Sequence, residues 1–159
     1  MTGKDSKPTR KDTTDKAAHA VEYFRRTFSC AQAILAAFGI ELGLTEELAL
    51  RVAGAFGGGM ARMGETCGAV TGSMMAIGLK HGKIKAADDE AREKTYRLVD
   101  EFVNAFKAKH GSIVCRELLH CDMSTPEGFQ DFKDRKLIET HCARFVKDAA
   151  EILEKILSK

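Results

Sequence analysis

From Lys16 onward, the apolar residues recur at the spacing of amphipathic helices. The clearest stripe is Leu98, Phe102 and Phe106, spaced four residues apart with charged residues opposite. A helix of 3.6 residues per turn brings such positions onto one face. The sequence contains no alternating run of Val, Ile and Thr bounded by turn residues, which is what a strand requires. The pattern therefore predicts an all-α protein.

Capping residues and glycines divide this pattern into predicted elements. Helices are predicted at residues 16–26, 30–42, 46–56, 67–80, 88–109, 112–120, 125–133 and 140–157. A glycine-rich loop at residues 57–64 precedes the helix that opens with the sequence CGAVTG. We find no repeat or linker within residues 16–159 and expect one helical bundle there. Residues 1–15 are polar, and we expect them to form a disordered tail.

Charge and cysteine content narrow the functional class. The 159 residues carry 25 basic and 23 acidic side chains, a formal net charge of +2. This balance offers no electrostatic case for binding nucleic acid or a membrane surface. No apolar run approaches the ~18 residues of a membrane span, and the polar N-terminus does not resemble a signal peptide. We therefore expect a cytoplasmic protein, whose five cysteines are thiols, metal ligands or redox centres rather than structural disulfides.

Four of the five cysteines share a local context, since each follows a Ser or Thr by one to three residues. They are Cys30, Cys67, Cys115 and Cys142. This context predicts that each lies in the first turn of a helix, where unpaired N–H groups and the helix dipole stabilise a thiolate. Cys121, at the end of a predicted helix, lacks this support. The alternative is that the cysteines are small core residues.

The glycines around Cys67 suggest a close approach of the backbone to another group. Glycine permits positive φ and leaves room for a ligand or a second helix. The candidates for binding a cofactor are Gly57, Gly58, Gly59, Gly64, Gly68 and Gly72, with tight helix packing as the alternative. The order GxxxxGK[ST] is absent, so this is not a phosphate-binding P-loop.

Other side chains near the cysteines are further candidates for roles at the site. His141 adjoins Cys142 and is a possible metal ligand or base, and Glu65 is a possible acid or base near Cys67. Four methionines could form an apolar wall or a surface between protomers; they are Met60, Met63, Met74 and Met75. Because the alanine-rich helices have Met and Gly faces, we expect a homodimer.

Four segments together resemble the C_GCAxxG_C_C family of redox-active proteins. They are FSCAQAIL, GGGM with GETCGAVTG, SIVCRELL, and HCARFVKDAAEIL, within residues 17–157. The family motif CGAxxG corresponds to Cys67–Gly72, and the family cysteines to Cys30, Cys67, Cys115 and Cys142, whereas Cys121 has no counterpart. The resemblance implies a helical fold and a redox or electron-transfer role. Iron–sulfur binding by these four cysteines is a reasonable extension of it.

Three hypotheses remain open at this point. In the first, the four cysteines hold an iron–sulfur cluster and exchange electrons with a partner protein, which requires at least three of them to converge. In the second, Cys67 is the attacking thiol of a thiol–disulfide oxidoreductase or redox sensor. In the third, the protein is a zinc-binding or structural helical module. The sequence contains no CxxC, so any shared site must be assembled by the tertiary fold.

Overall fold

The computed structural model describes residues 15–159, and this part of the chain is helical. The elements are α1 (Lys16–Arg25), α2 (Cys30–Gly39), α3 (Glu46–Val52), α4 (Gly68–His81), α5 (Asp89–His110), α6 (Cys115–Leu119), α7 (Pro126–Asp134), a π-helical turn η1 (Ile138–Cys142) and α8 (Ala143–Leu157). Within these residues there is no strand, and Thr66 and Val114 form an isolated bridge. The all-α prediction is confirmed.

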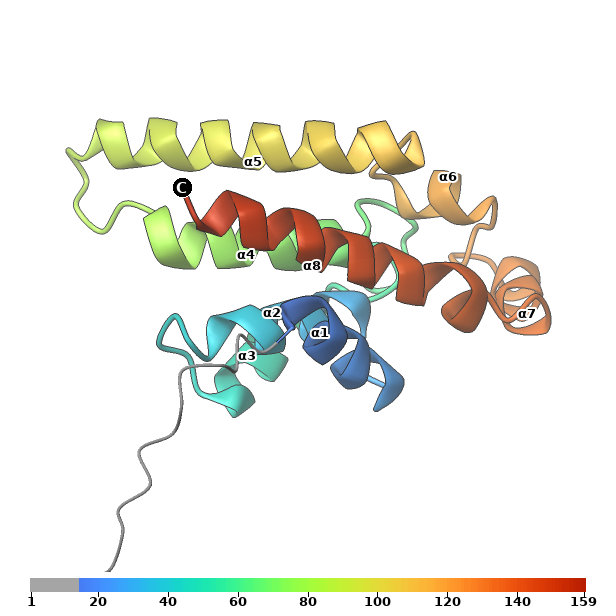
Figure 1. Cartoon of the computed structure of the whole chain (residues 1–159). Helices are drawn as coiled ribbons and strands as arrows, with labels where there is room; N and C mark the ends of the chain where they lie inside the picture. Colours follow the sequence, from blue (N-terminus) through green and yellow to red (C-terminus); the bar gives the residue numbers. More distant parts are fainter. Residues whose placement is uncertain (1–14) are drawn as a thin grey trace, which may run out of the picture.

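The helices pack around one shared core. α4, α5 and α8 run alongside one another, α1 and α2 cover the side of α4 and α8 opposite to α5, and α3 packs on α2 (Figure 1). The predicted stripe on α5 is buried, because Leu98, Phe102 and Phe106 are each at most 2 % exposed. Gly111 ends α5 in the left-handed conformation that glycine adopts at low cost. No helix in residues 15–159 is long and apolar enough to cross a membrane.

The close packing of α2 on α4 depends on two glycines of the CGAVTG helix. A Cβ atom at Gly72 would lie 2.8 Å from the carbonyl oxygen of Ala31, and one at Gly68 would lie 2.9 Å from the amide nitrogen of Ala31. Any larger side chain would force the two helices apart, because such distances are shorter than van der Waals contact. Gly68 and Gly72 therefore serve the helix packing that we considered as the alternative to a ligand.

Two predicted helix starts differ from the structure by two or more residues. The helix predicted at residues 112–120 begins at Cys115. The helix predicted to begin at Thr140 starts earlier, since η1 begins at Ile138 and continues into α8 without a break. Thr140 does not cap this helix, because its hydroxyl donates to the carbonyl oxygen of Lys136 at 3.0 Å. The tail predicted at residues 1–15 lies outside the described residues, except for Asp15, which caps α1.

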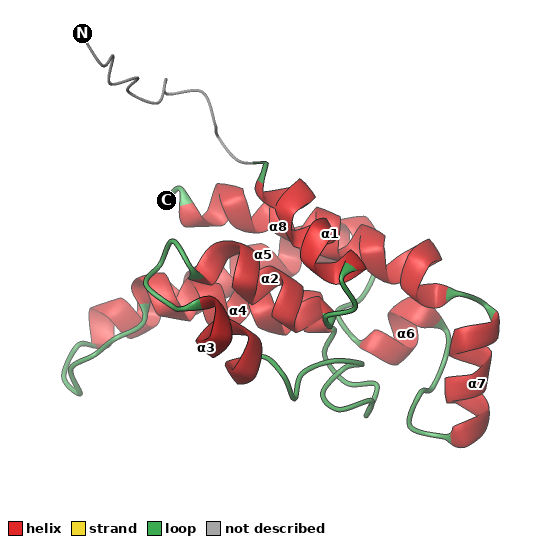
Figure 2. Ribbon diagram, turned by 90° about the horizontal axis from the view of Figure 1, so that it is seen from below, coloured by secondary structure: helices red, strands yellow, loops and turns green. Residues whose placement is uncertain are grey.

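α6 and α7 lie together at one end of the molecule (Figure 1). The long loop after α3 reaches the same end, as the green segments in Figure 2 show. Backbone hydrogen bonds join this loop to the segment before α6. The backbone amide of Cys67 donates to the carbonyl oxygen of Ile113 at 2.8 Å, and the backbone amide of Cys115 donates to the carbonyl oxygen of Glu65 at 2.6 Å. The pairing places Cys67 and Cys115 next to each other, although they are far apart in the sequence.

Candidate functional site

All four cysteines that follow a Ser or Thr line one cavity of about 1110 Å³ at this end of the molecule. We call Cys30, Cys67, Cys115 and Cys142 the cysteine cluster. Cys67, Cys115 and Cys142 are buried, whereas Cys30 is partly exposed, and all four are free thiols. Since the cavity brings together residues from α2, α4, α6 and η1, the site is assembled by tertiary structure, as the absence of a CxxC motif requires.

The start of α2 positions Cys30. Ser29 and Gln32 form a capping box, in which the Ser29 hydroxyl accepts from the Gln32 amide at 3.3 Å and the Gln32 side chain accepts from the Ser29 amide at 3.0 Å. Gln32 also donates to the carbonyl oxygen of Leu50 at 2.9 Å and so ties α2 to α3. Cys30 is the first helical residue, in agreement with the first-turn prediction.

The other three cysteines meet the helix-start prediction to different degrees. Cys67 occupies the N-cap position of α4, and Cys115 is the first residue of the short helix α6. Cys142 is the last residue of η1 and lies within continuous helical backbone, where the Ala143 amide already donates to the carbonyl oxygen of Ile138. For Cys142 the predicted first-turn position is wrong, because the π-turn extends the helix by two residues before Thr140.

Hydrogen bonds within the cluster separate the pKa values of its thiols. The pKa of Cys67 is lowered, chiefly by a hydrogen bond with Cys30 and further by the amides of Ala69 and Val70, against the effect of burial. The pKa of Cys30 is raised well above its usual value by hydrogen bonding with Cys142 and Cys67 and by desolvation of its thiol group, although the residue as a whole is partly exposed. The cluster therefore favours a thiolate on Cys67 and a protonated thiol on Cys30.

Cys115 differs from Cys67, because its pKa is raised rather than lowered. Burial, with smaller effects from Cys67 and Cys142, raises its pKa to about 12. A thiol with this pKa stays protonated at neutral pH and is a poor nucleophile, because the thiolate is the reactive form. Cys115 therefore contributes to the cluster as a neutral thiol.

The glycine-rich loop follows an unusual backbone path beside the cluster. Residues 58–62 all have positive φ, and three of them are not glycine: Met60 (64°), Ala61 (50°) and Arg62 (65°). The left-handed conformation costs roughly 1–2 kcal/mol for each residue with a Cβ. Such strain is retained where the surrounding structure fixes it, often at functional sites. The sequence offered no signal for this run, because Met, Ala and Arg rarely adopt this conformation.

The six glycines proposed from the sequence divide into two groups. Those that line the cavity are Gly57, Gly58, Gly59 and Gly68. The other two lie elsewhere, since Gly64 faces the side chain of Arg116 and Gly72 packs against α2. A Cβ at Gly57 would lie 2.8 Å from the Cβ of Ser29, so the absence of a side chain lets the loop approach the start of α2.

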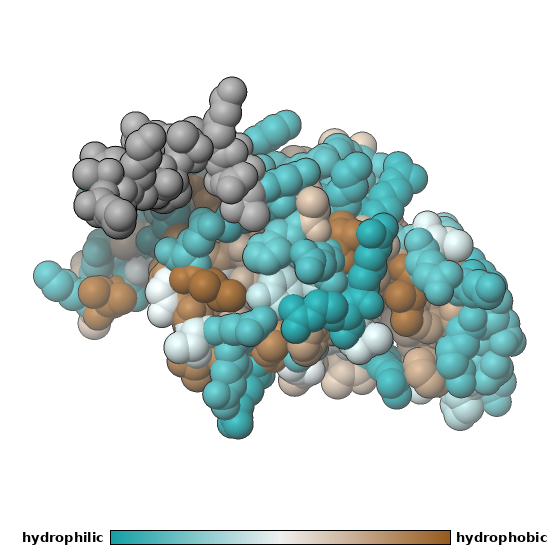
Figure 3. All heavy atoms as spheres, turned by 60° about the horizontal axis from the view of Figure 1, so that its bottom comes forward, coloured by the Kyte–Doolittle hydropathy of each residue, from teal (hydrophilic) through white to brown (hydrophobic). Residues whose placement is uncertain are grey.

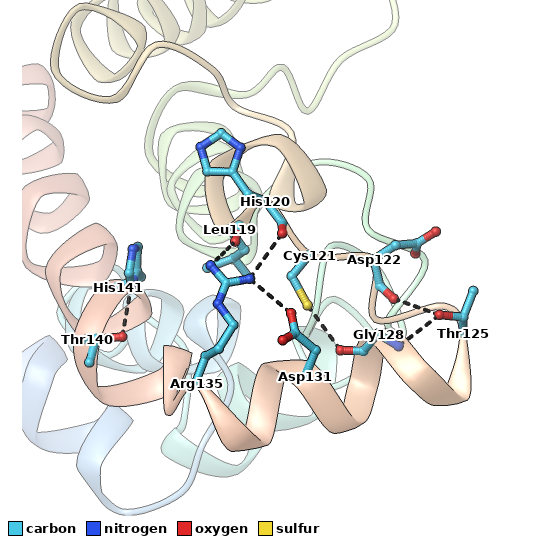
Figure 4. A network of polar contacts seen from close by, with 10 residues as sticks. All are labelled: Leu119, His120, Cys121, Asp122, Thr125, Gly128, Asp131, Arg135, Thr140 and His141. Atoms are coloured by element: carbon cyan, nitrogen blue, oxygen red, sulfur yellow. Dashed lines mark hydrogen bonds and ion pairs between the residues drawn. The ribbon is translucent and has the colours of Figure 1, made fainter.

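The remaining candidates from the sequence are engaged away from the cavity lining. Glu65 pairs with Arg116 at 3.0 Å. The ring nitrogen Nδ1 of His141 lies 2.8 Å from the hydroxyl of Thr140, and the thiol of Cys121 donates to the carbonyl oxygen of Gly128 at 3.0 Å (Figure 4). None of the four methionines proposed from the sequence lines the cavity within the described residues; Met123 does.

Sequence analysis missed the aromatic and charged parts of the cavity. Phe24, Phe28, Phe129, Phe132 and Phe145 all line it. The exposed part of the lining includes Arg25, Arg62, Lys133 and Glu139. Their distribution over five separate segments gave no local motif, and only the fold brings them together.

The cysteine cluster is not arranged as a metal site. Within residues 15–159, no three His, Cys, Asp or Glu side chains are placed to hold a metal ion. The donor chemistry suits iron or zinc, since thiolates bind both. The four sulfur atoms border a shared cavity without meeting around one ion.

Comparison with known proteins gives one family. The family model described as "Putative redox-active protein (C_GCAxxG_C_C)" matches residues 28–156, a stretch that contains the whole cysteine cluster. No curated protein and no solved structure matches the chain.

Proposed function

Because the chain belongs to the C_GCAxxG_C_C family of redox-active proteins, we propose that it carries redox equivalents on the cysteine cluster. The Cys67 and Cys30 thiols form the active couple and alternate between a dithiol and a disulfide. On oxidation, the two S–H groups lose two protons and two electrons to an acceptor, and one S–S bond forms. On reduction, a donor returns both.

The observation that carries this proposal is that Cys30 and Cys67 border the same cavity, close enough to act on each other's pKa. The interaction lowers the pKa of Cys67 and contributes to the raised pKa of Cys30. A nucleophilic thiolate next to a protonated thiol is the arrangement that thiol–disulfide exchange needs. The Cys67 thiolate attacks the oxidant and forms a covalent adduct. The Cys30 thiol then loses its proton, attacks the Cys67 sulfur and releases the reduced oxidant, which leaves the disulfide. Cys142 lines the same cavity and also raises the pKa of Cys30, so it is the alternative partner of Cys30.

Disulfide mapping tests this proposal. The reduced full-length protein is treated with diamide, a small thiol oxidant, and its disulfides are mapped by peptide mass spectrometry. We expect one disulfide that joins Cys67 to Cys30, and reduction should restore five free thiols. Cys121→Ser is the matched control, because Cys121 lies outside the cavity lining and should not affect the reaction. Five thiols that remain free after oxidation would disprove the proposal.

An iron–sulfur centre is the second candidate, favoured by a separate observation. All four family cysteines border the same cavity, whereas a dithiol couple needs two of them. Four cysteine thiolates are the usual ligands of [2Fe–2S] and [4Fe–4S] clusters. In the present geometry these residues do not form a metal site, so they would have to draw together around the cluster.

Anaerobic purification distinguishes the two candidates. A broad visible absorbance, with iron and acid-labile sulfide in fixed ratio to the chain, would establish the iron–sulfur hypothesis. Loss of this absorbance in Cys115→Ser would support Cys115 as a ligand, because Cys115 has no part in the dithiol couple. A colourless protein without iron would exclude the cluster for the isolated chain and leave the dithiol proposal.

The remaining expectations concern metal, partners and location. Zinc gains no support from the present arrangement of the cysteines. We retain as proposals an electron-donating or electron-accepting partner protein, a homodimer and a cytoplasmic location. For the homodimer, the surface in Figure 3 shows separate hydrophobic patches among hydrophilic residues rather than one continuous apolar face. Light scattering of the full chain measures the oligomeric state.

A further inference from the structure

We infer that the cavity beside the cysteine cluster binds an anionic aromatic redox compound of the quinone class, which exchanges electrons with the cluster. This inference rests on the proposed function and names a substrate class for it. Three features of the cavity support it: buried sulfur atoms, aromatic walls, and cations at its exposed edge that have no carboxylate partner within residues 15–159.

The burial of the cluster limits the size of its reaction partner. Cys67, Cys115 and Cys142 are 4 %, 6 % and 8 % exposed. Cys30 is partly exposed, but a disulfide on the surface of another folded protein cannot reach the Cys67 sulfur at this depth without rearrangement. A small molecule can enter the cavity, whose volume of about 1110 Å³ is sufficient for a drug-sized compound.

The walls of the cavity favour a flat aromatic body. Five phenylalanines line it: Phe24, Phe28, Phe129, Phe132 and Phe145. Phe129 and Phe132 on α7 are stacked with their ring centroids 6.3 Å apart. Aromatic side chains bind planar rings by stacking and edge-to-face contact, in addition to excluding water. A fused-ring compound fits this lining better than a peptide or a sugar, which would leave many polar groups without partners.

The exposed edge carries three cations, Arg25, Arg62 and Lys133, against one carboxylate, Glu139, and this excess of positive charge favours an acidic substituent. The guanidinium of Arg62 lies 4.2 Å and the ammonium of Lys133 lies 4.9 Å from the centre of the Phe129 ring. Within residues 15–159, neither side chain has a carboxylate at ion-pair distance, and the same holds for Arg25. Two cations held over one ring repel each other, so an anionic group beside Phe129 would be attracted to both.

Electron transfer to such a compound is balanced. The Cys67 and Cys30 thiols together lose two electrons and two protons and form one disulfide. The quinone gains the same two electrons and two protons on its two carbonyl oxygens and becomes a hydroquinone. No further reactant is needed.

Binding is tested first, without electron transfer. The oxidised full-length protein is titrated with anthraquinone-2-sulfonate, and the affinity is compared with that for uncharged 2-(hydroxymethyl)anthraquinone. The fused rings of these probes leave no free alkene position for thiol addition. We expect the sulfonate to bind more tightly, and the double variant Arg62→Gln/Lys133→Gln to lose about tenfold in affinity for the sulfonate alone. Lys147→Gln, an exposed lysine on α8, is the matched control.

Equal affinities for the two probes, or an unchanged affinity in the double variant, would overturn the inference. Reduction is tested next, by adding the sulfonate to the reduced protein and following the hydroquinone and the disulfide. If diamide forms the Cys67–Cys30 disulfide but the bound quinone is not reduced, the substrate class is wrong and the proposed function stands. If neither oxidant forms a disulfide, the proposed function itself fails.

Discussion

Gly59 and Cys115 approach so closely that a Cβ atom added to Gly59 would lie 2.7 Å from the Cβ of Cys115. The same atom would lie 2.7 Å from the amide nitrogen of Glu65. Gly59 also has a φ of +67°, which a residue with a Cβ adopts only at a cost. The loop can therefore border the cysteine cluster only with glycine at this position.

We predict that Gly59→Ala destabilises the protein by ~2–4 kcal/mol, because it adds both a clash and left-handed strain. Gly111→Ala is the matched control. Gly111 also has positive φ, but a Cβ there would have no atom within 4 Å, so strain alone should cost ~1 kcal/mol. Urea unfolding measures both. Equal losses in the two variants would show that Cys115 does not confine the loop.

A second prediction concerns the order in which the thiols become reactive as the pH rises. Cys67 should be alkylated before Cys115, because the pKa of Cys67 is lowered whereas that of Cys115 is raised to about 12. Iodoacetamide labelling of the reduced protein at a series of pH values, read by peptide mass spectrometry, measures this order. Labelling of Cys115 before Cys67 would contradict the described electrostatics of the cluster.

The role of Cys30 is tested by a pair of substitutions. Cys30→Ala removes the hydrogen bond that contributes most to lowering the pKa of Cys67, so this pKa should rise and the alkylation of Cys67 near neutral pH should slow several-fold. Cys30→Ser keeps a donor in the same place and should restore much of the rate. Equal rates in the two variants would mean that Cys67 depends on its backbone amides instead.

The sequence predicted those parts of the fold that depend on local chemistry. Ser29 and Gln32 are three residues apart, as a capping box requires, and the structure has this box at the start of α2. The stripe of Leu98, Phe102 and Phe106 is likewise a local pattern, and it is buried as predicted. Such features need no knowledge of the rest of the chain.

Features set by tertiary contacts were not predictable in this way. Thr140 resembles a helix cap, but its hydroxyl bonds backward to Lys136 within a π-turn that local propensity does not encode. The left-handed conformation of Met60, Ala61 and Arg62 opposes their intrinsic preference. Only the fold places Arg62 over Phe129, so the cationic edge of the cavity was absent from the sequence-based prediction.

A further prediction concerns the attachment of α7, which forms one wall of the cavity. Arg135, just after α7, donates to the carbonyl oxygens of His120 at 3.1 Å and Leu119 at 3.3 Å, at the end of α6 (Figure 4). Because Arg135 is partly exposed, Arg135→Gln should cost no more than ~1 kcal/mol of global stability. Limited proteolysis should nevertheless cut residues 120–135 faster. Arg51→Gln, which removes an exposed ion pair within α3, should leave this cleavage unchanged; equal protection of residues 120–135 in Arg135→Gln would contradict the anchoring role.

The last prediction concerns His110, which is buried behind Phe145 of the cavity wall. Its Nε2 lies 3.0 Å from Oδ2 of Asp148, and its side chain is 5 % exposed. Burial lowers its pKa below 6.5, although Asp148 acts in the opposite direction. The imidazole of His110 therefore takes up a proton more readily in the unfolded chain than in the folded one. His110 favours folding above about pH 6.5, and this contribution to stability is lost as the pH falls.

We therefore expect the free energy of unfolding to decrease between pH 7.5 and 5.5, two values that are about one unit on either side of the usual histidine pKa. Each unit by which the pKa is lowered corresponds to ~1.4 kcal/mol. His110→Gln loses the contacts of His110 with Asp148 and Phe145, so it should be less stable at pH 7.5. Because glutamine does not take up a proton, the difference in stability between the two pH values should also be smaller. Urea unfolding of both proteins at each pH measures this effect. If the variant keeps the full difference, the acid sensitivity arises elsewhere, and His81, whose pKa is also lowered by burial, is the next residue to replace.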